Sequence, residues 1–231
     1  MTNLAIIPAR GGSKRIPRKN IKEFHGKPII AYSIEVALKS CLFNEVMVST
    51  DDPEIARIAK KYGAKVPFYR SKKNADDVAT TSDVLIEVIE NYEKREASFT
   101  HACCIYPTAP FITKNSLELG LEKLIEDKTT SVFPVVPFTY PIWRGFKKTE
   151  KGKFTLVWPK YINTRSQDLE DIYHDAGQWY WFRVDDFKTN KNLFVENTSS
   201  IVINLMEMQD IDNIHDWHLA ELKYEHLQSL K

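Results

Sequence analysis

The sequence predicts an α/β fold whose centre is a mostly parallel sheet. Short apolar runs, which suit buried strands, alternate with segments in which apolar residues recur at helical spacing. This alternation is typical of βαβ units, whose crossovers are right-handed. The length of 231 residues suits one domain with its own core, so we expect a single domain over residues 1–231.

Apolar runs bounded by turn residues are the expected strands. They lie at residues 4–7, 46–48, 65–69, 102–106, 131–136, 177–182 and 201–205. The expected helices lie at residues 28–38, 53–62, 81–95, 114–126 and 214–227.

The ends of these helices carry recognisable residues. Pro28 and Pro53 fit the first helical position, where a missing N–H costs nothing. Gly63 should end the second helix. The N-cap of the third helix should be Thr80, Thr81 or Ser82. The inward face of the first helix should hold Ile30, Ile34, Ala37 and Leu38.

The alternation breaks after Pro137. Residues 138–175 are rich in aromatic residues, proline and charge, and Lys151-Gly152 suggests a hairpin turn. We expect an excursion inserted into the single domain, with its exposed aromatic residues forming a dimer contact or a wall for a substrate.

Composition limits the classes of partner. The formal net charge of +1 gives no overall attraction to nucleic acid. No apolar run approaches the ~20 residues of a membrane span, and no secretory leader is visible, so we expect a cytoplasmic protein. Cys41, Cys103 and Cys104 show no zinc spacing, and the adjacent pair should be buried in a strand.

A basic loop follows the first expected strand. Gly11 and Gly12 lie in it, together with five cationic residues, Arg10, Lys14, Arg15, Arg18 and Lys19. Glycine lets backbone N–H groups approach an anion, and the cations add charge that a polyphosphate would neutralise. We therefore favour a phosphate cradle over a merely solvated basic loop. It is not an ATPase P-loop, because the Gly-Lys-Ser/Thr ending is missing.

Polar loops follow the other expected strands. They are at residues 49–52, 70–82, 106–110 and 209–212. Ligands of open parallel sheets bind where strands end and loops begin, so these loops should meet the basic loop at one sheet edge.

Asp210 and Asp212 are two residues apart, which places both carboxylates on one side of an extended segment. Two carboxylates beside a polyphosphate suit Mg²⁺, which keeps water and phosphate as its other ligands. The alternative is a pair of charges at the N-terminus of the following helix. The phosphate cradle expected at the same edge favours the metal.

The segment from 163 to 178 is dense in hydrogen-bonding groups. Arg165 has the fork geometry that holds a carboxylate or phosphate, but a surface loop with internal ion pairs explains it equally well. His174 is either a general base or a structural hydrogen-bonding residue.

The chain resembles the CMP-sialic acid synthetases and their relatives, the sugar-acid cytidylyltransferases. The resemblance rests on Pro-Ala-Arg-Gly-Gly-Ser-Lys-Arg-Ile-Pro-Arg-Lys-Asn at residues 8–20. It continues through residues 49–52, 107–110, 165–169 and 209–212, in the same order. Within this family, the likeness is greatest to members of bacterial surface-glycan pathways that use pseudaminic acid. Tyr106 and the segment 174–178 depart from the sialic acid enzymes where the sugar should lie.

The resemblance implies a Rossmann-like, three-layer nucleotidyltransferase fold with an inserted dimerisation excursion. It also implies a homodimer, CTP as donor, a nonulosonic acid as acceptor and Mg²⁺ as cofactor. The implied nucleotide-binding residues are Ala9, Arg10, Gly11, Gly12, Ser13, Lys14, Arg15, Asn20, Arg70, Thr81 and Ser82. The implied sugar-binding residues are Tyr106, Thr108, Arg165, Gln167 and Gln178, part of them reaching a partner subunit. Arg10, Lys14, Lys19 and Asp212 would be catalytic, with Asp210 and Asp212 holding the metal.

Three alternatives stay open at this point. The same reaction could use N-acetylneuraminic acid, legionaminic acid or the shorter Kdo. The donor could be UTP or GTP. Outside the enzymes, the chain could be a catalytically silent nucleotide-binding module, although the Asp210–Asp212 pair disfavours it.

Overall fold

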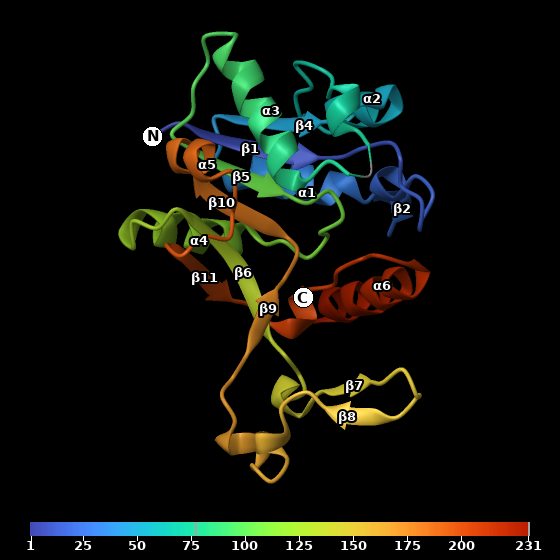
Figure 1. The fold of residues 1–231 in the computed structure, drawn as a ribbon. Coiled ribbons are helices and arrows are strands. Elements are labelled where there is room, and N and C mark those ends of the chain that lie inside the picture. The colour runs from blue at the N-terminus through green and yellow to red at the C-terminus, as the bar shows by residue number, and fades with distance from the viewer. Residues whose placement is uncertain (77, 231) are drawn as a thin grey trace.

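The computed structural model describes residues 1–76 and 78–230. Its central strands are β1 (Asn3–Pro8), β4 (Glu45–Ser49), β5 (His101–Ile105), β6 (Ser131–Pro137), β9 (Tyr173–Asp175), β10 (Trp179–Arg183) and β11 (Thr198–Val202). They form one seven-stranded sheet in the order β11-β6-β10-β5-β1-β4, with β9 paired to β6 (Figure 1).

The sheet is mostly parallel, as predicted. Strand β1 pairs in parallel with β4 and β5, and β6 pairs in parallel with β11. Strand β10 lies between β5 and β6 and runs antiparallel to both. The carboxyl ends of β1, β4 and β5 therefore lie at one edge of the sheet.

Helices cover both faces of this sheet, which confirms the predicted three layers. The helices are α1 (Ile30–Ser40), α2 (Pro53–Lys61), α3 (Thr81–Glu93), α4 (Lys114–Glu126), α5 (Val184–Asn190) and α6 (Ile214–Ser229). Alternation along β1 explains the layering. Ala5 and Ile7 pack in one core with α1, α2 and α4, while Leu4 and Ile6 pack in a second core with α3 and α5.

Shorter elements complete the chain. They are β2 (Glu23–Phe24), β3 (Lys27–Pro28), β7 (Phe146–Lys148) and β8 (Phe154–Leu156). Short 3₁₀ helices lie at Lys19–Ile21, Lys72–Asn74, Ile142–Arg144, Pro159–Tyr161, Ser166–Asp168 and Leu205–Glu207.

The predicted helix ends are largely confirmed. Asp52 caps α2 by accepting hydrogen bonds from two backbone N–H groups, and Pro53 takes the first helical position. Gly63 follows the helix with a φ of 95°, a left-handed conformation that glycine adopts without strain. Thr80 caps α3 in a reciprocal capping box with Asp83.

Some local predictions were wrong. Residues 65–69 form no strand, and only a single bridge joins Met47 to Lys65. Pro67, which has no N–H, cannot extend that pairing. Pro28 lies in β3 rather than opening α1, and Leu38 is 40% exposed instead of facing the core.

The region after β10 also differs from the prediction. The final strand, β11, covers Thr198–Val202, so the predicted residues 203–205 lie beyond its end. Their segment turns at Asn204, which caps a short 3₁₀ helix. The sequence analysis missed α5, whose seven residues are too few to show a helical period.

The excursion leaves the sheet after Pro137, the last residue of β6, and returns at Tyr173, the first residue of β9. These two residues are partners in the antiparallel pairing of β6 with β9. In between, the β7–β8 hairpin forms at the predicted turn and extends away from the sheet (Figure 1). A small aromatic cluster stabilises it, with the Trp143 ring centroid 5.4 Å from that of Trp158. Tyr140, Phe146 and Phe154 remain exposed on the excursion.

Cys103 and Cys104 are fully buried in β5, as predicted, and burial raises the pKa of both thiols. In the described part of the chain, no helix combines the length and apolar character that crossing a bilayer requires.

Gly120 marks the closest approach of α4 to the sheet. A Cβ atom at this position would lie 2.3 Å from Trp179 and 3.0 Å from Trp181. Both indole rings are fully buried, so neither can move aside. We expect Gly120→Ala to lower the free energy of unfolding by about 1–3 kcal/mol, measured by urea denaturation. Gly152→Ala, at an exposed hairpin turn with a φ of 75°, offers a comparison in which only backbone strain is added. If Gly120→Ala were as stable as the native chain, this packing would be contradicted.

Candidate functional site

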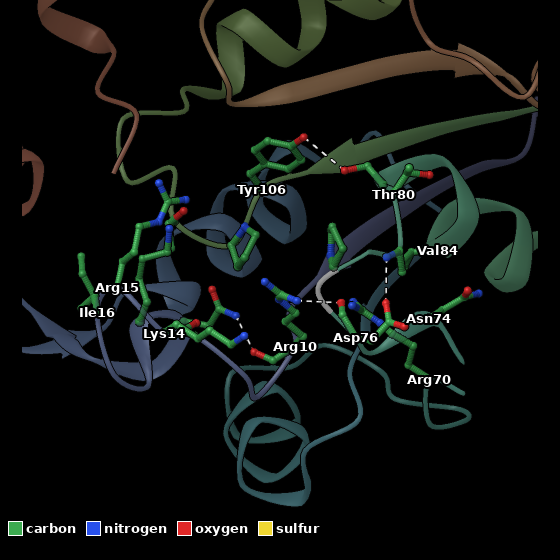
Figure 2. Close-up of a pocket in the computed structure, with 18 of the residues that line it drawn as sticks. Arg10, Lys14, Arg15, Ile16, Arg70, Asn74, Asp76, Thr80, Val84 and Tyr106 are labelled. Atoms are coloured by element: carbon green, nitrogen blue, oxygen red, sulfur yellow. Dashed lines mark hydrogen bonds between the residues drawn. The ribbon is translucent and has the colours of Figure 1, made fainter. Parts of the chain in front are cut away.

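A cleft of about 470 Å³ lies at the carboxyl edge of β1, β4 and β5. Its lining comes from segments that are far apart in sequence, as predicted from the order of the strands. The basic loop lines one side with Arg10, Ser13, Lys14, Arg15, Lys19 and Asn20. Arg70, Asn74, Asp76, Thr80, Thr81, Tyr106, Thr108 and Asp212 are among the residues that line the rest (Figure 2).

The basic loop starts as a continuation of β1. Ala9 is buried, and its N–H donates to the Ser49 carbonyl at 2.9 Å, so it anchors the start of the loop to the end of β4. The buried Asn20 side chain donates to the Arg10 carbonyl at 2.9 Å and ties the two ends of the loop together. The N–H of Gly11 donates to Asp51 Oδ1 at 2.9 Å. This glycine N–H, expected to face an anion, is therefore occupied by a carboxylate.

The cations of the loop take different directions. Arg10 reaches across the cleft and donates to the Asp76 carbonyl at 2.7 Å (Figure 2). Lys14 and Arg15 project into the cleft from the opposite side in the same view. Lys19 is half-buried and donates to the Ile211 carbonyl at 2.5 Å, and this burial lowers the pKa of its ammonium group. Arg18 instead pairs with Asp52, the N-cap of α2, and with Glu54 in the first turn of that helix.

Asp210 and Asp212 flank the buried Ile211, so both carboxylates lie on the side away from the core. Asp212 lines the cleft and accepts a hydrogen bond from Arg15 at 2.7 Å. Asp210 is exposed as a whole residue, but its carboxyl group is partly enclosed by protein. This burial raises the pKa of the carboxyl group, and the nearby charge of Asp212 raises it further. Two close carboxylates that oppose each other's ionisation suit a divalent cation.

The chain supplies few protein ligands beyond this pair. Among the described residues, no group of three or more His, Cys, Asp or Glu side chains could enclose a metal ion. A cation held by Asp210 and Asp212 would therefore need water or a bound phosphate as its remaining ligands. This donor set fits Mg²⁺, which binds through one or two carboxylates and substrate oxygens.

Arg70 lies at the floor of the cleft and is only 8% exposed. Its guanidinium group donates to the Ser49 hydroxyl at 3.1 Å and to the Ser49 carbonyl at 2.6 Å. Burial lowers the pKa of Arg70 to about 10, which still leaves it charged at neutral pH. Thr81 also lines the cleft, while Ser82 lies on α3 and lines a separate hollow together with Glu87.

The residues predicted to bind a sugar are spread over three places. Tyr106 and Thr108 line the cleft, and the Tyr106 hydroxyl lies 3.3 Å from the Thr81 hydroxyl. Gln178 is buried and donates to the Glu207 carbonyl at 2.5 Å, so it supports the segment before Asp210 instead of lining the cleft.

Arg165 and Gln167 lie at the short 3₁₀ helix Ser166–Asp168 on the excursion, and neither is among the residues that line the cleft. Arg165 forms an ion pair with Asp168 at 2.7 Å, as the surface-loop alternative expected. His174 contacts Phe138 and the Asp175 carbonyl, and it is not among the cleft residues.

Asn74 and Asp76 also line the cleft. Both lie in the polar loop 70–82 that was expected at this sheet edge, but neither was predicted as a binding residue. Asn74 ends the short 3₁₀ helix Lys72–Asn74 and Asp76 follows it, and no periodicity could reveal the path of this loop. Their polarity and their place after Arg70 were the available signal.

Comparisons with known proteins agree with this arrangement. A family model described as "Cytidylyltransferase" matches residues 4–192. The chain is 43% identical over 224 residues to the pseudaminic acid cytidylyltransferase of Campylobacter jejuni, which covers 97% of each chain. It is 34% identical over 230 residues to the CMP-N,N'-diacetyllegionaminic acid synthase of Legionella pneumophila, covering 96% of this chain and 95% of that one.

Among solved structures, the fold is similar to that of CMP:2-keto-3-deoxy-manno-octonic acid synthetase in complex with CTP. The TM-score is 0.70 at 18% sequence identity, covering 99% of this chain and 100% of the other. This likeness confirms the predicted nucleotidyltransferase fold.

Proposed function

The chain belongs to the cytidylyltransferase family, and from this premise we propose that it transfers CMP from CTP to pseudaminic acid. The anomeric hydroxyl of the sugar acid attacks the α-phosphorus of CTP. A new P–O bond forms, the bond to the β-phosphate oxygen breaks, and pyrophosphate leaves. The substrate follows the name of the Campylobacter jejuni relative, which covers 97% of both chains.

One observation carries the proposal: cationic and acidic side chains from opposite ends of the chain meet in one cleft. Arg10, Lys14 and Arg15 face into the cleft that Asp212 also lines. A triphosphate needs cations along its length, and phosphoryl-type transfer depends on positioning and charge neutralisation more than on covalent help from the protein. The cleft supplies both.

The roles of these side chains follow from their places. Arg10 and the half-buried Lys19 clamp the triphosphate, and Lys14 and Arg15 stabilise the charge of the leaving pyrophosphate. Asp210 and Asp212 hold Mg²⁺, which would lower the negative charge facing the incoming hydroxyl. The buried Arg70 and Thr81, which line the same cleft, orient the cytidine part.

We place the sugar acid at the end of the cleft formed by Tyr106 and Thr108. Within one chain, Arg165 lies on the excursion and does not line the cleft. We therefore propose a homodimer in which the excursion of one subunit reaches the cleft of the other. The exposed Tyr140, Phe146 and Phe154 supply apolar area for such a contact. The reaction belongs in the cytoplasm, where nucleoside triphosphates are available.

Arg165→Ala tests the sugar-binding role of the excursion. We expect the KM for the sugar acid to rise roughly 10- to 100-fold, because a hydrogen bond to a charged group contributes about 1.5–3 kcal/mol, while the KM for CTP stays near its native value. Arg57→Ala removes an exposed arginine from α2 and is the matched control. Steady-state kinetics with each substrate varied in turn measure both constants. An equal rise of both KM values would contradict the assignment.

Pyrophosphate release with each of the four nucleoside triphosphates tests the proposed donor. With pseudaminic acid present, we expect release with CTP to exceed release with UTP, GTP or ATP. A preference for another triphosphate would overturn the nucleotide assignment. CTP binding by calorimetry, without pyrophosphate release from any sugar acid, would identify a non-catalytic nucleotide-binding module instead.

A further inference from the structure

The turn after β4 touches the basic loop at both of its ends. Asp51 accepts the N–H of Gly11 near the start of the loop, and Asp52 pairs with Arg18 near its end. We propose that Asp51 and Asp52 are positioning residues that hold the basic loop in its phosphate-binding shape before CTP arrives. This inference rests on the proposed function, because it concerns how the same cleft receives its triphosphate.

The first contact fixes Gly11. Its nitrogen lies 2.9 Å from Asp51 Oδ1, and the position that a Cβ would take faces the Asp52 side chain. A Cβ on Gly11 would lie 2.7 Å from Asp52 Oδ2 and 3.1 Å from Asp52 Cβ. Gly12, by contrast, has open space around its Cα, with no atom within 4 Å of an added Cβ. Position 11 therefore needs glycine for steric reasons, because the loop passes close to the Asp52 side chain there.

The second contact fixes Arg18. Its guanidinium group donates to both oxygens of Asp52, at 2.5 and 3.1 Å, and to Glu54 at 2.5 Å. Arg18 also has a left-handed backbone conformation, with a φ of 55°, which a non-glycine residue adopts only where its surroundings hold it. This cation is thus used to anchor the loop and not to meet phosphate.

Asp52 cannot easily move away from either contact. Its Oδ1 atom also accepts the N–H groups of Glu54 and Ile55, which caps α2. Arg18 lowers the pKa of the Asp52 carboxyl group to about 2, so it is ionised at neutral pH. Through this one side chain, the basic loop is tied to the first turn of α2 and to the end of β4. A loop held in this way loses less conformational freedom when CTP binds.

Asp52→Asn separates the positioning role from the helix cap. Asparagine is as good an N-cap as aspartate, so α2 should keep its first turn. The charge that holds Arg18 is lost, however, and CTP must then order the loop as it binds. We expect the KM for CTP to rise roughly tenfold, with kcat and the melting temperature near their native values.

The matched variants are Arg18→Met with its control Arg57→Met, and Gly11→Ala with its comparison Gly12→Ala. Arg18→Met should raise the KM for CTP as Asp52→Asn does, and the double variant should be no worse than the poorer single one, since both break the same pair. Arg57→Met removes one exposed cation from α2 and should leave the KM unchanged. Gly11→Ala should raise the KM more than Gly12→Ala does. Additive effects of Asp52→Asn and Arg18→Met, or a native KM in both, would overturn the proposal.

Hydrogen exchange of the unliganded protein tests the loop without any nucleotide. Amides of residues 10–20 should exchange faster in Asp52→Asn than in the native chain, with the sheet unchanged. Suppose that the native chain binds no CTP, while the amides of residues 10–20 exchange faster in Asp52→Asn than in the native chain. The proposed function then fails and the positioning role stands. If the native chain binds CTP while Asp52→Asn has native exchange and native KM, the positioning role alone is overturned.

Discussion

Replacing Asp212 by asparagine should lower turnover roughly 100- to 1,000-fold while leaving the fold intact, as is typical when a stabilising charge is removed at a reacting centre. Asp212 lines the same cleft as Arg10, and its side chain is 45% exposed, so its ion pair with Arg15 should add little to the stability of the fold. Asparagine keeps the size of the side chain and removes the negative charge. Pyrophosphate release at saturating CTP, sugar acid and Mg²⁺ measures the loss.

A second readout separates metal binding from catalysis. Mn²⁺ serves as a spectroscopic substitute for Mg²⁺, and its binding is followed by electron paramagnetic resonance in the presence of CTP. Asp212→Asn and Asp210→Asn should each weaken Mn²⁺ binding, and Asp185→Asn, on the exposed first turn of α5, should not. Native turnover and native Mn²⁺ binding in both site variants would remove the pair as metal ligands.

Arg10→Ala should raise the KM for CTP roughly 10- to 100-fold, because a hydrogen bond to a charged group contributes about 1.5–3 kcal/mol. Arg10 lines the cleft and reaches the Asp76 carbonyl at 2.7 Å, where its guanidinium group can meet a triphosphate. Steady-state kinetics and calorimetric titration with CTP measure the effect.

Arg10→Lys keeps the charge without the planar fork, so it should recover only part of the loss. Circular dichroism should report a native fold for both variants. A native KM for CTP in Arg10→Ala would contradict the phosphate cradle, whatever its effect on the sugar acid.

Where periodicity and end signals agreed, the sequence predicted the fold closely. Helix α4 begins and ends at the predicted residues, Lys114 and Glu126. The failures have physical causes. The apolar run at 65–69 looks like a strand, but Pro67 prevents it from pairing beyond its first residue.

The cleft could be predicted because the order of elements decides which loops meet at a sheet edge. The direction of a single long side chain is not set by that order. Arg18 pairs with Asp52 and does not line the cleft, although the next residue, Lys19, does. Likewise, the Gln178 side chain donates to the Glu207 carbonyl and does not line the cleft.

The sugar site was the hardest part to predict, for the same reason. Tyr106 is at the cleft, but Arg165 lies on an excursion that leaves the domain. Contacts between subunits leave no periodic pattern in a single sequence, and exposed aromatic residues are the one sign of them here. Which residues complete the sugar site therefore depends on the proposed dimer.

Competition between sugar acids tests the proposed function most directly. Equal amounts of pseudaminic acid, N,N'-diacetyllegionaminic acid and N-acetylneuraminic acid are mixed with the enzyme, CTP and Mg²⁺, and the CMP-sugars formed at early times are separated and quantified. CMP-pseudaminic acid should be the main product, with the others at least roughly tenfold lower, since losing one well-placed hydrogen bond to a substrate costs at least that much. A main product from either of the other two acids would contradict the proposed acceptor.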